Sequence, residues 1–126
     1  MPTQAEQLRA RTKQFAIRIV RLFKCLPKTD EARIIGKQVL RAGTSVAANY
    51  RAVNRARSRA EFISKMGVVV EEADETVFWL ELLVETGIVN MTRLGNLLTE
   101  ANEILAIFAA SHWTARRGEH SSHLAN

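Results

Sequence analysis

The sequence predicts an all-α fold, an up-down-up-down antiparallel four-helix bundle built as one domain. Apolar residues recur at alternating four- and three-residue intervals along most of the chain, which is the spacing of a helix with one buried face. No segment alternates with period two, as a half-buried strand would. Six glycines and two prolines are few for a chain of 126 residues, and 47% of the residues in the chain are hydrophobic. This composition favours long helices over a loop-rich fold.

The first helix is predicted over residues 5–26, and Pro27 ends it because proline has no amide hydrogen to donate. Thr29 or Asp30, in the short polar connection that follows, can cap the second helix, which is predicted over residues 31–57. A connection this short makes the two helices antiparallel neighbours.

Two glycines and one asparagine stand out within the second helix. Gly36 and Gly43 lie seven residues apart, and each costs about 1 kcal/mol of helix propensity relative to alanine. Glycine at both positions predicts the close approach of a neighbouring helix. Asn49 interrupts the apolar seam, and a buried amide must be hydrogen-bonded. We therefore expect Asn49 to cap or bridge neighbouring helices and to fix their register, rather than to bind a ligand.

The third helix is predicted over residues 59–86 and begins with a capping box. In this motif the Ser58 hydroxyl and the Glu61 carboxylate each satisfy a backbone amide at the start of a helix. The corner between the second and third helices is thereby placed near Arg57.

The third helix carries more apolar surface than a lone bundle needs. Two apolar rows run along it, and three further large residues lie beside them: Phe78, Trp79 and Leu82. One apolar stripe per helix is enough for a single bundle, so the excess predicts that another subunit covers part of this surface.

The fourth helix is predicted over residues 91–114, after Gly87, which is placed to adopt the left-handed conformation that ends a helix. Residues 116–126 show no periodicity and are predicted to form a disordered tail. The bundle domain is therefore expected to cover residues 1–115.

The composition predicts a cytoplasmic protein. Cys25 is the only cysteine, so no internal disulfide can form, and no basic-then-apolar signal segment opens the chain. Acidic residues interrupt the most apolar helix, so no membrane span is expected.

Charge is strongly polarised between two adjacent helices. Residues 31–59 contain seven basic residues and one acid, whereas residues 71–85 contain six acids and no base. One interpretation is that arginines of the second helix pair with carboxylates of the third, within or between subunits, in ion pairs that are individually weak.

The other interpretation is contact with nucleic acid. Arg51, Arg55 and Arg59 follow at i, i+4 and i+8 and are expected to form a ridge that contacts phosphates, with Arg57 and Lys65 beside the corner. The net charge of +5 favours an acidic partner such as a phosphate backbone. The candidate phosphate contacts are Arg41, Arg51, Arg55, Arg57, Arg59 and Lys65.

No catalytic, metal or cofactor site is predicted. The serines lack a plausible histidine base, so nucleophilic catalysis has no support. A di-iron site requires Glu-x-x-His pairs from two helices, and no histidine precedes His112. His120 and His123 have a possible metal spacing in the tail, but they have no partner cysteine and only Glu119 as a nearby acid.

Several segments resemble a known family. They are Gln38-x-x-Arg41, residues 44–50 (TSVAANY), residues 55–58 (RARS), Glu61-Phe62, and the acidic run at 71–76 that leads to Trp79-Leu80-Glu81-Leu82. Together they resemble the bacterial four-helix-bundle family named for proteins encoded in intervening sequences of the large-subunit ribosomal RNA gene. They are also similar, more distantly, to the accessory variability protein of diversity-generating retroelements. The resemblance implies a closed homopentameric ring with a basic surface that binds nucleic acid, and no enzyme activity.

Two functions are predicted as alternatives. In the first, a non-enzymatic homo-oligomer, a pentamer by resemblance, associates with RNA or DNA through its basic surface, without cofactor or membrane. In the second, the ring is a structural adaptor that recruits a protein partner through its charged faces. A ring would multiply a modest binding surface in either case.

Overall fold

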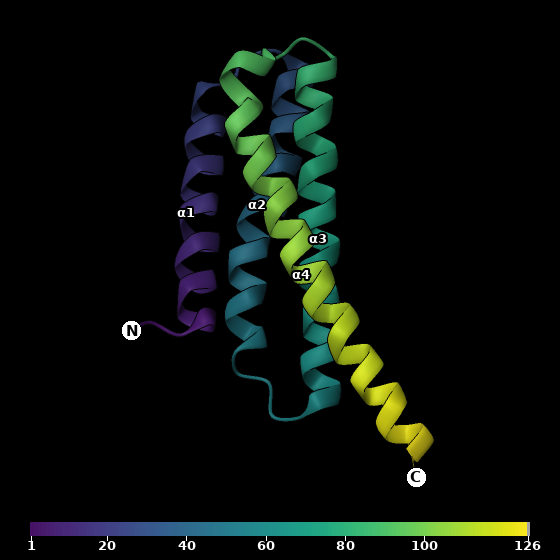
Figure 1. Ribbon diagram of the computed structural model, residues 1–126. Coiled ribbons are helices and arrows are strands. Elements are labelled where there is room, and N and C mark those ends of the chain that lie inside the picture. Colours follow the sequence, from purple (N-terminus) through teal and green to yellow (C-terminus); the bar gives the residue numbers. More distant parts are fainter. Residues whose placement is uncertain (126) are drawn as a thin grey trace.

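The computed structural model describes the backbone of residues 1–125 and the side chains of residues 1–118. Over these residues the protein is all-α, without a strand. The helices are α1 (Gln4–Cys25), α2 (Asp30–Val53), α3 (Arg59–Glu85) and α4 (Met91–Ala125). They run alternately up and down, and each packs against the next in the chain (Figure 1). The predicted fold class is confirmed, and the pentameric ring stays a prediction.

The helices α1 and α4 close the bundle, but they touch over a short stretch only. The lower half of α4 leans away from α1 and across α3, and its last turns project beyond the other helices (Figure 1). The seam between α1 and α4 is therefore the least covered side of the core.

Each of the first three helices begins with a hydroxyl cap. Thr3, Thr29 and Ser58 are the capping residues, and each side-chain oxygen accepts a hydrogen bond from the backbone amide three residues on. Of the two candidates for capping α2, it is Thr29 that does so. The box at α3 is half formed within the described residues, because the carboxylate of Glu61 faces basic side chains instead of the Ser58 amide.

The second helix ends at Val53, four residues before the predicted end. Asn54 accounts for the difference, since its side-chain Nδ2 and its backbone N both donate to the carbonyl of Tyr50, at 2.8 and 3.3 Å. The next two amides donate to carbonyls three residues back, in a tighter turn than the α-helix. An asparagine that bonds nearby backbone competes with the helical ladder, and the chain leaves the helix here.

Asn49 is predicted from the sequence to cap or bridge neighbouring helices, but within the described residues it does neither. It is half-buried, and its Nδ2 donates to the carbonyl of Ser45 in the same helix at 2.8 Å. A local bond to the carbonyl four residues earlier satisfies this amide group. Apolar packing, rather than an amide contact, must therefore set the register of α2 against its neighbours.

The helices α1 and α2 approach closely at two glycines. A Cβ atom at Gly43 would lie 2.8 Å from Ile19 Cγ1, and one at Gly36 would lie 2.6 Å from Leu26 Cδ1. Non-bonded carbon atoms do not come this close at rest, so the glycines make room for α1. The predicted close approach at Gly36 and Gly43 is confirmed.

The core extends along the whole bundle, with Phe15, Ile19, Leu80 and Phe108 almost fully buried. None of the helices in the described part of the chain combines the length and apolar character needed to cross a bilayer.

The fourth helix continues through Ala125, beyond the predicted end at residue 114. The added segment contains no proline and one glycine, Gly118, which costs only about 1 kcal/mol of helix propensity. Nothing in the local sequence therefore forces the helix to stop. The side chains of His120 and His123 lie outside the described residues, as does all of Asn126, and disorder of residues 116–126 stays a prediction.

Replacing Gly43 with alanine is expected to lower the free energy of unfolding by about 1–2 kcal/mol, because overpacking exceeds the gain in helix propensity. The new methyl group meets Ile19, a β-branched and fully buried side chain with few alternative rotamers. Urea denaturation measures the change. Gly95→Ala is the matched control, since its Cβ would meet only Met91 Sδ at 3.8 Å and propensity should raise stability by up to ~1 kcal/mol. Equal stability of the two variants would contradict the close approach.

Candidate nucleic-acid interface

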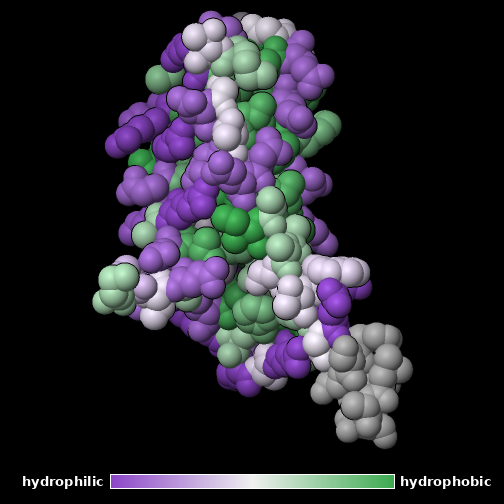
Figure 2. Space-filling view, viewed as in Figure 1, coloured by the Kyte–Doolittle hydropathy of each residue, from purple (hydrophilic) through white to green (hydrophobic). Residues whose placement is uncertain are grey.

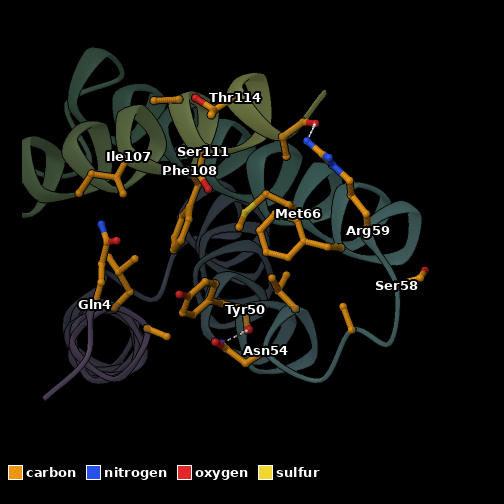
Figure 3. Close-up of a pocket in the computed structure, with 17 residues that line it drawn as sticks. Gln4, Tyr50, Asn54, Ser58, Arg59, Met66, Ile107, Phe108, Ser111 and Thr114 are labelled. Carbon is orange, nitrogen blue, oxygen red and sulfur yellow. Dashed lines mark hydrogen bonds between the residues drawn. The ribbon is translucent and has the colours of Figure 1, made fainter. Parts of the chain in front are cut away.

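The lower end of the bundle in Figure 1 contains an open groove of about 1040 Å³. It forms where α4 leans away from the start of α1, and all four helices and the α2–α3 connection line it. Figure 3 shows Tyr50, Met66 and Phe108 deep in the groove, with Gln4 on the α1 side and Thr114 on the α4 side. Apolar surface is visible at this end between polar flanks (Figure 2).

Two aromatic rings pack together deep in the groove. Tyr50 and Phe108 have centroids 4.8 Å apart, and they are 5% and 1% exposed. Burial raises the pKa of Tyr50 above its usual value. Rings covered to this degree cannot receive a stacked base, so these aromatics belong to the core rather than to a stacking platform.

The α2–α3 corner, taken as residues 51–59, borders the groove and carries four of the six predicted basic residues. Arg51 lies in the last turn of α2, Arg55 and Arg57 in the connection between the helices, and Arg59 in the first turn of α3. The predicted ridge requires one continuous helix, and the early end of α2 removes it. The three arginines lie on three different segments, although all are exposed and at the same end of the bundle.

Arg59 extends over α4 at the edge of the groove (Figure 3). Its Nη2 lies 3.4 Å from the carbonyl oxygen of Ala115, and a Cβ atom at Gly118 would lie 1.7 Å from the same nitrogen. Gly118 thus leaves the space that the guanidinium occupies. This contact ties the start of α3 to α4, so Arg59 has a structural role within one chain.

Arg41 is engaged by the acidic face of α3. Its Nη1 donates to Glu72 Oε2 at 3.1 Å, and its Nη2 donates to Glu75 Oε1. The bond from Arg41, with a weaker one from Trp79 Nε1 at 3.3 Å, holds the pKa of Glu75 below its usual range. Arg41 therefore fits the ion-pair interpretation and links α2 to α3.

The remaining predicted basic residues are paired weakly or not at all. Arg57 Nε and Lys65 Nζ lie 3.7 and 3.8 Å from the carboxylate of Glu61, too far for good hydrogen bonds. The Arg57 side chain is 89% exposed, so its pair contributes little. Arg51 and Arg55 form no ion pair with any carboxylate in the described part of the chain.

A second charged cluster joins α1 to α4 one turn beyond the groove. Arg11 donates from Nε and Nη2 to the two oxygens of Glu100, at 2.8 and 2.7 Å, and from Nη2 to Glu103 at 2.7 Å. The hydrogen bonds from Arg11 hold the pKa of Glu100 below its usual range. No sequence pattern indicated this link, because Arg11 and Glu100 are 89 residues apart and no local spacing relates them.

The structure adds no candidate metal site among the residues it describes. No three histidine, cysteine, aspartate or glutamate side chains come together within that part of the chain. The absence of a cofactor and of enzymatic activity stays a prediction.

Known proteins share both the sequence pattern and the fold. The profile of a family described as 23S rRNA-intervening sequence protein matches residues 6–110, which is nearly the whole bundle. The chain belongs to the 23S rRNA-intervening sequence protein family. The resemblance predicted from the sequence motifs is confirmed, and all the candidate residues from Arg41 to Lys65 lie within the part that the family shares.

A solved structure shows the same architecture. It is a protein of unknown function from the S23 ribosomal protein family of Bacteroides thetaiotaomicron, 34% identical to this chain, with a TM-score of 0.80. The alignment covers 87% of this chain and 98% of that one. No curated protein matches the chain. The family profile ends at residue 110, so the projecting end of α4 lies outside it.

Replacing Glu100 with glutamine is expected to reduce the loss of stability in acid. The folded-state pKa of Glu100 is depressed, so the stability it contributes is present above the unfolded pKa, about 4.5, and is lost as pH falls through the folded value. Denaturation midpoints measured from neutral pH down to about pH 3 should therefore fall less steeply in the variant than in the parent.

The matched control for this experiment is Glu103→Gln. Glu103 accepts one bond from Arg11 and its side chain is 57% exposed, against 19% for Glu100, so its removal should change the acid dependence less. If the denaturation midpoints of the parent and Glu100→Gln fall in parallel with pH, the hydrogen bonds between Arg11 and Glu100 contribute nothing to the acid dependence of stability.

Proposed function

We propose that this protein is a non-enzymatic, oligomeric four-helix bundle that associates with nucleic acid, RNA in the first place, through the α2–α3 corner. The observation that carries the proposal is that Arg51 and Arg55 are exposed there and form no ion pair within the described residues. The description of its family, which refers to 23S rRNA, supports an RNA-related setting in the cytoplasm.

The chemistry of the corner suits phosphate. A guanidinium group without a carboxylate partner can donate two parallel N–H bonds to one phosphate, and this geometry favours arginine over lysine. Arg57 can exchange its weak pair with Glu61, at 3.7 Å, for a phosphate oxygen. The corner offers charge rather than groups for reading base edges, so we expect binding that is largely independent of sequence.

The outer face of α3 supports self-association. Phe78 and Val68 are 54% and 40% exposed there, whereas Trp79 and Leu82 are partly buried within one chain. The exposed acids of the same face are Glu71, Asp74 and Glu81. The outer face of α2 is the complement, since it is basic and carries Ile34, which is 65% exposed. A contact between two different faces is head-to-tail and can close into a ring, which agrees with the homopentamer that the resemblance implies.

A ring increases the binding available to a weak site. Several copies of the corner on one assembly convert separate weak contacts with one strand into a multivalent contact. Homo-oligomerisation and association with nucleic acid are therefore parts of the same proposal.

A structural adaptor that recruits a protein partner is the second candidate function. The open groove favours it, because a space of about 1040 Å³ with an apolar floor can receive apolar side chains of another protein. The two candidate functions use different surfaces of the bundle: nucleic-acid binding depends on the corner arginines, and recruitment of a protein partner depends on the groove.

Replacing Arg51 and Arg55 together with glutamine is expected to flatten the salt dependence of RNA binding. The slope of log K against log salt should fall by about 1.4 to 1.8 for each subunit engaged, at roughly 0.7 to 0.9 per lost phosphate contact. Fluorescence anisotropy over a salt series measures the slope. Arg41→Gln is the control, because Arg41 is held by Glu72 and Glu75 and should leave the slope unchanged. If the double variant binds as the parent does, the corner is not the interface and the adaptor is favoured.

Replacing Phe78 with serine is expected to weaken the assembly. Light scattering of the parent should give about five times the 14.1 kDa of one chain, and the variant should shift toward a single chain as apolar contact area is lost. Met91→Ser is the control, since Met91 is 53% exposed at the start of α4, away from the α3 face. A parent that remains at 14.1 kDa at micromolar concentration would rule out self-association.

A further inference from the structure

The end of α1 and the start of α4 lie side by side at the opposite end of the bundle from the groove (Figure 1). A small hollow lies between them. Its volume is about 290 Å³. Arg18, Arg21 and Cys25 line it from α1, where their i, i+3 and i+7 spacing puts them on one face. Arg93 lines it from the first turn of α4. Three arginines from two helices therefore line one depression.

The rest of the lining is apolar. Val89, Leu94 and Leu97 are 8%, 1% and 6% exposed, and no carboxylate lines the hollow. A depression lined by charges of one sign, over low-dielectric walls, focuses the electrostatic field and raises the local concentration of counter-ions. The start of α4 adds positive potential from its helix dipole.

The three arginines have no ion-pair partner among the described residues. Carboxylates are available on the same seam, but Glu100 and Glu103 are both engaged by Arg11, two turns before Arg18. Arg18 influences Glu100 only at a distance, where its charge adds slightly to the lowering of that pKa.

Three like charges line one depression, and their mutual repulsion is modest because all three side chains are exposed to solvent. An anion in the hollow would relieve the repulsion. Arg11, on the same helix, differs from these arginines because it is neutralised by Glu100 and Glu103 and joins α1 to α4.

We infer that this three-arginine hollow is a second binding site, for the phosphate group of a nucleotide. The fork of an arginine pairs with two phosphate oxygens, and three forks around one depression match a group with several charged oxygens. The volume is near the lower end of ligand sites and suits a group of mononucleotide size. The site goes beyond the proposed function, since the corner lies at the other end of α2, about 36 Å away for 24 residues.

Cys25 provides a local test. It is the only cysteine, it is exposed, and it lines the hollow, so a bound ligand should shield it from alkylation by iodoacetamide, an uncharged reagent. The probes are inorganic phosphate, adenosine monophosphate and a short oligoribonucleotide with a 5′-hydroxyl end, each at low salt. At ten times its Kd, a probe should slow alkylation roughly ten-fold, because only the free site reacts.

Variants separate this site from the corner. Arg21→Gln combined with Arg93→Gln should abolish protection, whereas Lys13→Gln, an exposed change on α1 outside the hollow, should leave it intact. The Arg51→Gln and Arg55→Gln double variant should also retain protection, so loss of the proposed function at the corner would not affect this result. Circular dichroism checks that each variant remains helical.

The outcomes are distinct. Protection by phosphate or adenosine monophosphate assigns the site to a free or terminal phosphate, and protection by the oligoribonucleotide alone assigns it to an internal phosphate of a strand. Both results support the inference. Absence of protection by all three probes, or equal protection in the parent and the Arg21→Gln, Arg93→Gln variant, would overturn it.

Discussion

The contact of Ile19 with Gly43 determines where α1 lies, and the rest of the surface depends on that position. With α1 held close to α2 and α4 packed on α3, the seam between α1 and α4 is the least closely packed contact of neighbouring helices. Arg11 closes this seam through Glu100 and Glu103. The groove lies on one side of that link and the three-arginine hollow on the other. Both depressions therefore result from the close packing of α1 on α2 and its loose packing against α4.

The distribution of carboxylates decides which arginines are free to bind other molecules. Acids on α3 engage Arg41, and acids on α4 engage Arg11, which leaves the two ends of the bundle with unneutralised guanidinium groups. Charge in the middle of the bundle is therefore used to join helices. Charge at its ends is exposed, where a long anionic partner can reach it without entering the core.

Features that depend on local spacing could be predicted from the sequence. Helix number, the caps at Thr29 and Ser58, and the close approach at Gly43 each follow from residues a few positions apart. The corner lies near Arg57 as predicted, but the predicted end of α2 lies four residues too late. The asparagine side chain at residue 54 competes for a helical carbonyl, and the spacing of apolar residues gives no sign of this competition. The ridge of three arginines failed for the same reason.

Contacts between residues far apart in the sequence could not be predicted from local spacing. Arg11 and Glu100 meet across 89 residues, and the arginines of α1 meet Arg93 only after the bundle closes. The count of basic residues along the sequence pointed to residues 31–59, where seven of them lie close together in the chain. The arginines around the hollow belong to α1 and α4, and they can be recognised as a group only once the fold places these two helices side by side. The sequence indicated that the protein is basic, and the fold determines where that charge is concentrated.

The weak closure between α1 and α4 has a consequence for how the chain folds. Most contacts join helices adjacent in sequence, and only the α1–α4 seam connects the two ends of the chain. A bundle rich in such local contacts has a low contact order, and we expect it to fold within microseconds to milliseconds. The hairpins α1–α2 and α3–α4 can each form on their own residues. Joining the two ends comes at little loop-closure cost, since α2 and α3 already hold both hairpins together.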